Sequence, residues 1–201
     1  MVDPKSILFT TSTLNDALPA YQVDQTPCQK LLQLHEDDWR QFEAISATYT
    51  TAIDQELMGI RKIHETASVR TKMGDRDITV FRSVHIRKLI RSPVSPCLEL
   101  AEFAALADNR DRFAGFSLSG SPPAVGGYAF QMAGLVIYGQ ADGDRVLSIC
   151  FSYSEAPRLT PEKAEQLAAL LEKNHLIVVH WPSATKLDVK TQFVGFLTRT
   201  E

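Results

Sequence analysis

The chain has few cysteines and no long apolar run, and each of these shortages excludes a class of protein. The three cysteines, Cys28, Cys97 and Cys150, lie far apart. An odd, widely spaced set fits neither a disulfide framework nor a zinc site, so we expect free thiols in a reducing, cytoplasmic environment. The longest wholly apolar runs have four or five residues, too few to cross a membrane. The N-terminus has no basic segment ahead of an apolar one, so no signal peptide is expected.

Recognisable catalytic and metal-binding motifs are also lacking. No His-Glu-x-x-His or Cys-x-x-Cys spacing occurs. His175 and His180 lie five residues apart across a predicted strand, so their side chains point to opposite faces and cannot share one metal. The run Gly115-x-Ser117-x-Ser119 ends in serine where a nucleophile elbow needs glycine. We therefore predict no catalytic residue, no metal site and no cofactor, which favours a non-enzymatic role.

Positive charge is scarce overall, because 21 lysines and arginines face 24 acidic residues and give a net charge of −3. A general nucleic-acid binder usually needs a strongly basic domain, so nucleic acid is not an expected partner, and neither is a membrane. A composition of 44% hydrophobic and 22% charged residues is typical of a globular domain. We expect a loosely structured N-terminal arm over residues 1–29 and a single domain over residues 30–201.

Two helices are predicted near the start of this domain. Glu36, Asp37 and Asp38 would occupy the first turn of one helix, where carboxylates favour the positive end of the helix dipole. Its apolar stripe is formed by Trp39, Phe42, Ile45 and Tyr49. The apolar face of the second helix is formed by Ile53, Leu57, Ile60 and His64. Gly59 weakens this second helix by about 1 kcal/mol relative to alanine.

The apolar period then changes from about 3.6 to 2, which predicts a mainly antiparallel sheet. A first hairpin joins residues 69–71 to a long strand over residues 78–90, in which His85 and Arg87 share one face and Ile86 lies on the opposite, apolar face. A loop is expected over residues 117–127. The pair Asp142-Gly143 predicts a second hairpin, between residues 133–141 and 144–153, with Tyr138 opposite Leu147.

A helix capped by Thr160 and opened by Pro161 is predicted to pack on this sheet and to end at Asn174. The remaining elements are a short helix within residues 98–107, an inner strand over residues 176–179 and a last strand over residues 192–198. The predicted fold class is therefore α+β, with an N-terminal helical pair, a mainly antiparallel sheet and a C-terminal helix packed on it.

The strongest functional signal is the segregation of charge along the chain. Between His35 and Glu56 six acids face one base, and between Arg61 and Arg91 nine bases face three acids. The two adjacent segments therefore carry net charges of −5 and +6 in a chain of −3. Local charge of this kind steers and selects partners more directly than net charge does.

This pattern predicts a non-enzymatic protein-binding module, such as a bacterial immunity-type inhibitor that neutralises a partner protein through charged surfaces. The candidate partner-binding residues are Glu36, Asp37, Asp38, Glu43, Arg82, His85, Arg87 and Lys88. An alternative is an enzyme or small-ligand domain in which His85 and Arg87 hold an anionic ligand. A third interpretation is that the acidic and basic segments pair with each other, inside the fold or across a homodimer.

Overall fold

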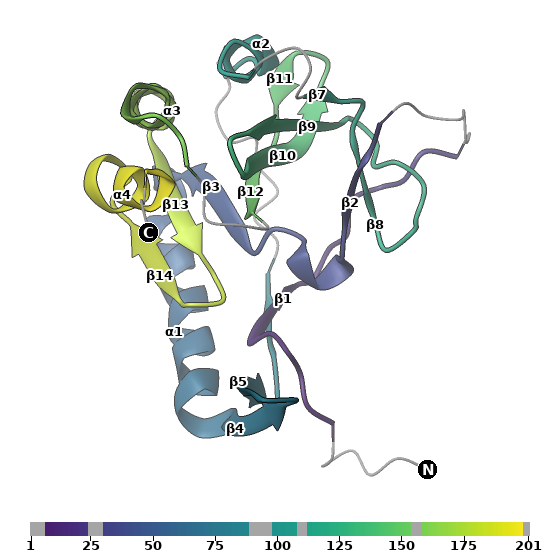
Figure 1. Cartoon of the computed structure of the whole chain (residues 1–201), viewed down its shortest axis with the longest axis vertical. Helices are drawn as coiled ribbons and strands as arrows, with labels where there is room; N and C mark the ends of the chain where they lie inside the picture. Colours follow the sequence, from purple (N-terminus) through teal and green to yellow (C-terminus); the bar gives the residue numbers. More distant parts are fainter. Residues whose placement is uncertain (1–6, 24–29, 89–97, 108–111, 154–157, 199–201) are drawn as a thin grey trace.

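The computed structural model describes residues 7–23, 30–88, 98–107, 112–153 and 158–198, and shows a sheet-rich α+β body (Figure 1). Its main sheet has eight strands, and every neighbouring pair in it is antiparallel. The order across the sheet is β14 (Thr185–Leu187), β13 (Leu176–His180), β3 (Phe42–Ser46), β12 (Ile149–Tyr153), β10 (Leu135–Asp142), β9 (Gly127–Met132) and β7 (Arg112–Phe113). The eighth strand, β11 (Arg145–Val146), also pairs with β10.

Three two-stranded pairings lie outside the main sheet in the described part of the chain. β1 (Thr13–Asn15) runs parallel to β6 (His85–Arg87), and β2 (Leu32–Leu34) runs parallel to β8 (Phe116–Leu118). β4 (Ser68–Met73) and β5 (Arg76–Phe81) form an antiparallel hairpin. Residues 7–23 are thus attached to the rest of the chain through β1, and the division at residue 29 stays a prediction.

Helices cover both faces of the main sheet. They are α1 (Thr50–Ala67), α2 (Leu100–Ala104), α3 (Pro161–Lys173) and α4 (Val194–Leu197), with single turns η2 (Glu36–Asp38), η3 (Ala47–Tyr49) and the π-helical η5 (Val189–Phe193). On one face α1 buries Ile53, Leu57 and Ile60 against Ile45 and Val179 of the sheet. On the other face α2, α3, η5 and α4 close the largest core. None of the helices that the structure describes is both long and apolar enough to span a bilayer.

The first predicted helix is wrong, because η2 ends at Asp38 and β3 follows as an interior strand. Both faces of β3 are covered, since Phe42 and Ala44 belong to the core beneath α3 while Ile45 packs against α1. A strand buried on both faces is apolar almost throughout, so its large side chains can imitate a helical stripe. The second predicted helix is confirmed as α1, so one helix stands where an N-terminal pair was expected.

The second predicted hairpin is present, but its register is wrong. Its turn closes one residue later than expected. The backbone oxygen of Gln140 then accepts from the amides of both Leu147 and Ser148, at 2.8 and 3.2 Å, which is a bulge that shifts the pairing again. Tyr138 consequently lies opposite Cys150 instead of Leu147. Ile149 and Phe151 therefore share a face and a core with Leu135 and Ile137, whereas Cys150 lies on the face of Tyr138.

Of the other predicted elements, some are confirmed and some are wrong. The predicted long strand is divided, because β5 ends at Phe81 and β6 begins only at His85. Ile86, on the predicted apolar face, is 52% exposed, and residues 89–90 lie outside the described residues. The predicted loop over residues 117–127 overlaps β8 and the first residue of β9. The segment 192–198, predicted as a strand, is helical instead, since it comprises the end of η5, all of α4 and the cap residue Thr198. The Thr160 cap, the inner strand β13 and the short helix α2 are confirmed. At the end of α3 the residue with positive φ is His175, at 51°, and not Asn174.

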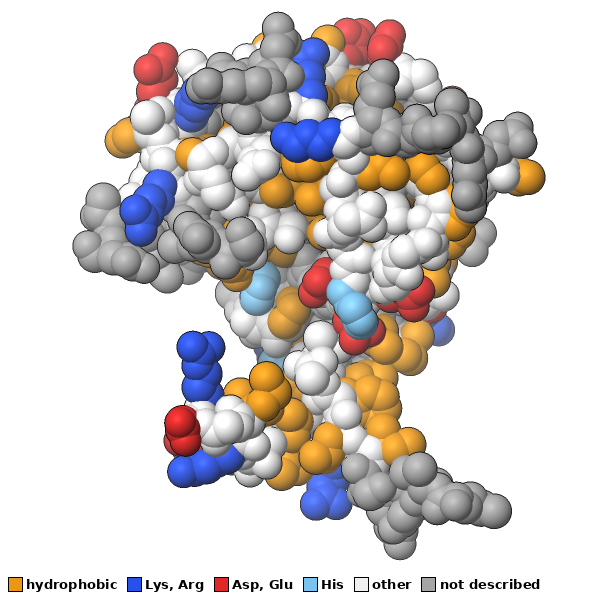
Figure 2. Space-filling view, turned by 45° about the vertical axis from the view of Figure 1, so that its right-hand side comes forward, with side chains coloured by type: hydrophobic (Ala, Val, Ile, Leu, Met, Phe, Trp, Pro, Cys, Tyr) orange, Lys and Arg blue, Asp and Glu red, His pale blue; other side chains and the backbone are white. Residues whose placement is uncertain are grey.

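One part of the molecule projects beyond the sheet. The C-terminal half of α1, the hairpin β4–β5 and residues 7–9 form a narrower lobe below the body (Figures 1 and 2). Phe9 and Phe81 exchange backbone hydrogen bonds of 2.8 and 2.9 Å, and the ring of His64 stacks on Phe81 with centroids 5.4 Å apart. We call residues 7–9 and 58–82 together the projecting lobe.

Candidate functional site

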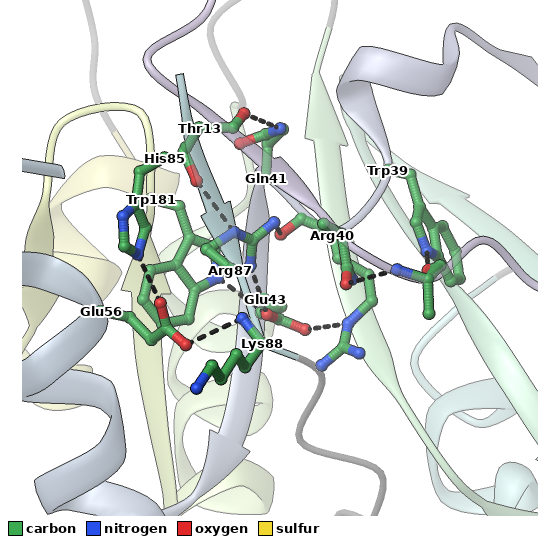
Figure 3. A network of polar contacts seen from close by, with 12 residues as sticks. Thr13, Trp39, Arg40, Gln41, Glu43, Glu56, His85, Arg87, Lys88 and Trp181 are labelled. Atoms are coloured by element: carbon green, nitrogen blue, oxygen red, sulfur yellow. Dashed lines mark hydrogen bonds and ion pairs between the residues drawn. The ribbon is translucent and has the colours of Figure 1, made fainter. Parts of the chain in front are cut away.

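An acidic side chain is buried at the centre of the main sheet. Glu43 lies on β3, on the same face as Ile45, and is 1% exposed. Its Oε1 accepts from Trp181 Nε1 at 2.7 Å and from Arg87 Nη1 at 3.2 Å, and its Oε2 accepts from Arg40 Nε at 2.6 Å (Figure 3). These donors replace the water that a carboxylate loses on burial, without which its charge would be strongly disfavoured.

Arg87 of β6 is the buried cation of this network and is 3% exposed. Its Nε donates to Thr13 Oγ1 at 3.1 Å, and its Nη2 donates to the backbone oxygen of Arg40 at 2.9 Å. The guanidinium also lies 4.6 Å from the ring centroid of Trp181. Burial lowers the pKa of Arg87 to about 10 while the Glu43 carboxylate opposes the shift, so Arg87 keeps its charge at neutral pH. One side chain thus connects β6 with β1 and β3.

A second set of contacts attaches β6 to α1. Glu56 Oε2 lies 2.5 Å from His85 Nε2, and Glu56 Oε1 accepts from the backbone amide of Lys88 at 2.9 Å (Figure 3). Gly59 leaves room for this pair, because a Cβ at position 59 would overlap the His85 ring. We use the name ionic joint for two linked groups of side chains. The first is Glu43 with its donors Arg40, Arg87 and Trp181, and the second is Glu56 with His85.

The ionic joint leaves little room for a ligand. The hollow at its centre, bordered by both glutamates and by Arg40, Arg87 and Lys88, has a volume of about 10 Å³, which is space for about one water molecule. An anion at Arg87 would also compete with Glu43, which already accepts from its guanidinium. The joint therefore fastens β6, and with it the projecting lobe, to the body. The acidic and basic segments do pair inside the fold here, as Glu43 with Arg87 and Glu56 with His85.

The other predicted acids lie on η2, on a different segment from the joint. Glu36 and Asp38 are exposed, and Asp37 is half-buried. Trp39, which follows directly, is 3% exposed and anchors this turn to the core. The acidic surface expected from the sequence therefore consists of these three side chains, since Glu43 points into the interior.

The projecting lobe displays exposed basic charge. Residues 58–82 contain six bases and three acids, a net charge of +3 in a chain of −3, which leaves −6 for the rest. Arg61 donates from Nη2 to the backbone oxygen of Ala184 at 3.0 Å. For the other five bases, no hydrogen bond or ion pair within the described residues engages the charged group. These five exposed bases are Lys62, Arg70, Lys72, Arg76 and Arg82.

Exposed apolar side chains accompany these bases. Met58 is 66% exposed and Met73 is 70% exposed, while Ile7 and Leu8 are each 46% exposed. Ile86 adds a further exposed apolar side chain where the lobe meets the body. Figure 2 shows apolar and basic side chains next to one another over the lobe. Arginine and methionine are enriched in protein interfaces, and clustered exposed apolar side chains often mark one.

The sequence alone does not reveal which groups surround Glu43. Arg40 and Glu56 are not part of any recognisable sequence motif. From the sequence, Trp181 would be expected only to fill space at the edge of the sheet. One usable signal is present, because a single acid inside the apolar run of residues 42–45 has to find a buried donor if that run is an interior strand.

Nothing in the described part of the chain resembles a metal centre or a reactive thiol. Among those residues no three His, Cys, Asp or Glu side chains lie close enough together to hold a metal ion. Cys150 is a buried free thiol whose pKa is raised by burial, which suppresses the reactive thiolate. Comparison of the chain with protein families, characterised proteins and solved structures finds no match, so the function is argued from this geometry.

Proposed function

We propose that this chain is a non-enzymatic protein-binding module that uses its projecting lobe to engage an acidic surface of a partner protein. The observation that supports the proposal is the group of five exposed bases whose charges have no partner within the described residues. Such charges act over about the Debye length, roughly 8 Å at physiological salt, and so raise the rate of association with an acidic partner.

The composition of the lobe favours a protein over a nucleic acid. Asp77 lies directly opposite Lys72 in the hairpin, and Glu65 and Asp75 add negative charge that a phosphate backbone would repel. Met58 and Met73 offer flexible apolar contacts, which suit the mixed surface of a protein.

The ionic joint supports this role because it fixes the direction of the lobe before binding. An element that is already positioned loses less conformational entropy on association. A lobe of this kind can cover a functional surface of its partner, and we extend the proposal to an inhibitor of the bacterial immunity type. The buried free thiol of Cys150 accords with a reducing, cytoplasmic location as part of the proposal.

The test introduces a photo-crosslinking residue at Thr79, exposed on β5, and in a second protein at Glu165, exposed on α3. We expect a partner protein from the native cells to crosslink through position 79 and not through position 165. The purified partner is then titrated with the charge-reversed variant R70E/K72E/R76E/R82E. We expect the dissociation constant to rise at least about tenfold, and added salt should no longer weaken the binding, because the reversed lobe repels an acidic surface.

A matched control removes charge from the acidic turn in the variant E36Q/D38N, for which we expect the dissociation constant of the wild type. The assignment to the lobe fails if the charge-reversed variant binds as tightly as the wild type while the E36Q/D38N variant binds more weakly. Tight binding of the wild-type chain to duplex DNA at physiological salt would contradict the choice of a protein partner.

A further inference from the structure

A groove opens on the face of the main sheet that is opposite α1. It lies where η5 and α4 cover β13 and β14, and Figure 1 shows α4 beside these two strands. Its volume is about 580 Å³, within the range of about 300–1,000 Å³ that is usual for small-molecule sites. The walls come from β3, from β12 and from the four consecutive elements β13, β14, η5 and α4. The fold thus forms a concave site that the proposed lobe interface does not use.

Aromatic rings form one side of this groove. Phe42 meets Tyr153 and Phe196 edge to face, with ring centroids 6.4 and 5.5 Å apart, and Tyr153 and Phe196 lie 5.1 Å apart. Tyr153 is 41% exposed, so part of this aromatic surface faces the opening. Aromatic rings arranged in this way attract a further ring by offset or edge contacts, worth more than an equal area of aliphatic surface.

Polar groups without charge also border the groove, and the ring of His180 meets Phe42 edge to face with centroids 5.3 Å apart. His180 Nδ1 lies 2.6 Å from Ser183 Oγ, and Ser183 Oγ lies 3.1 Å from Thr185 Oγ1. Burial lowers the pKa of His180, so its imidazole is neutral at neutral pH. The Ser183 contact occupies Nδ1, and no described residue makes a hydrogen bond to Nε2, which is therefore available to a ligand.

The charge of the lining restricts the ligand. None of the described residues that border the groove is an aspartate, glutamate, lysine or arginine. A charged ligand would lose its hydration there without gaining an opposite charge, whereas an uncharged ring with one polar group would satisfy both walls.

We propose that this groove binds an uncharged, planar aromatic molecule that carries a hydroxyl or amide group, with the ring against Phe42, Tyr153 and Phe196 and the polar group at His180. The site is independent of the proposed lobe interface, so either can fail without the other.

The structure offers a variant that fills the groove without disturbing the fold. Gly195 borders the groove from α4, has no positive φ, and has no atom within 4 Å of the position that a Cβ would take. Gly195→Phe therefore places a ring in open space and removes a helical glycine. Gly195→Ala is the matched control, because it makes the same change to the helix and leaves most of the groove open.

The experiment titrates the full chain with 2-naphthol, followed by chemical shifts of groove residues. We expect a dissociation constant of about 1 mM or tighter, raised at least about tenfold by Gly195→Phe and little changed by Gly195→Ala. The charged analogue naphthalene-2-sulfonate should bind at least about tenfold more weakly than 2-naphthol. His180→Gln should weaken 2-naphthol binding while the thermal midpoint stays within the range of the controls.

Several results would overturn the proposal. They are the absence of shift changes at groove residues, unaltered binding to Gly195→Phe, and equal affinity for the sulfonate. If N-acetyltryptophan amide binds more tightly than 2-naphthol, the proposal of a free small molecule is wrong. The ligand of the groove would then be an aromatic side chain of a partner protein.

Discussion

At the scale of single residues, the network around Glu43 depends on one carboxylate that serves three donors. Without it the guanidinium of Arg87, 3% exposed, would remain in the interior with no opposite charge, and Trp181 Nε1 would lose its acceptor. Removing one partner of a buried ion pair typically costs about 3–5 kcal/mol. We predict that Glu43→Ala lowers the free energy of unfolding by about this amount, measured by urea denaturation.

Two variants separate the charge from the packing. Glu43→Gln keeps the volume and one acceptor oxygen, so its loss of stability should be smaller than that of Glu43→Ala. Replacing both Glu43 and Arg87 by leucine should cost less than the sum of the two single replacements, because the charge left unpaired by one change is removed by the other. Strictly additive losses would show that the two side chains stabilise the fold independently.

His180 adds a pH dependence whose sign follows from its environment. Burial lowers the pKa of His180 below its ordinary value of 6.5 in the folded state, so on acidification the unfolded chain binds a proton at this position first. The stabilisation is complete above the unfolded pKa and is lost as the pH falls through 6.5 toward the folded pKa. We predict that the loss of stability between about pH 7.5 and pH 5.5 is smaller in His180→Gln than in the wild type. An equal loss in both proteins would show that the His180 ring is solvated.

At the scale of elements, the packing of α1 on β6 depends on a glycine. In a helix interior alanine usually replaces glycine with a gain of about 1 kcal/mol. At position 59 the new Cβ would overlap the His85 ring and displace it from Glu56. We predict that Gly59→Ala destabilises the wild type but stabilises a His85→Ala protein by about 1 kcal/mol, measured as a double-mutant cycle in urea. Stabilisation in both backgrounds would mean that the His85 ring moves aside without cost.

The same elements show which parts of a fold a sequence determines locally. α1 and α3 each bury one stripe, and α3 also carries the Thr160 cap and Pro161, so periodicity and capping predict both helices. β3 buries both faces, which removes the alternation that identifies a strand. The bulge at Leu147 and Ser148 is set by contacts along the hairpin, so turn chemistry alone predicts the wrong register.

The sequence indicates some residues of the ionic joint but does not predict which side chains they contact. Alternation in a strand correctly places His85 and Arg87 on one face, and the local charge segregation draws attention to both segments. Their partners come from other elements, and the hydrogen bond from Arg87 to Thr13 spans 74 residues. No local pattern encodes a parallel pairing between β1 and β6, so the partners emerge only when the whole chain is folded.

At the scale of the whole molecule, the lobe and the body differ in how they are stabilised. The body is a multi-stranded sheet with a large core, whereas β4 and β5 form a two-stranded hairpin to which Phe9 adds a single bridge at Phe81. Most side chains of β4 and β5 are exposed. A two-stranded hairpin is marginally stable by itself, so the lobe depends on α1 and on the ionic joint. We therefore expect the lobe to open locally while the body stays folded.

Amide hydrogen exchange under native conditions tests this division. We predict that amides paired between β4 and β5 exchange at least about tenfold faster than those of β3, β12 and β13, because local openings need less free energy than global unfolding. Glu56→Ala removes the contacts to His85 and to the Lys88 amide, so it should accelerate exchange in the lobe and leave that of β10 and β12 unchanged. Equal protection of β4 and β13 in the wild type would show instead that the lobe unfolds only with the body. In that case the lobe would meet its partner as a rigid part of the body, held by α1 and the ionic joint, and binding would not slow its amide exchange selectively.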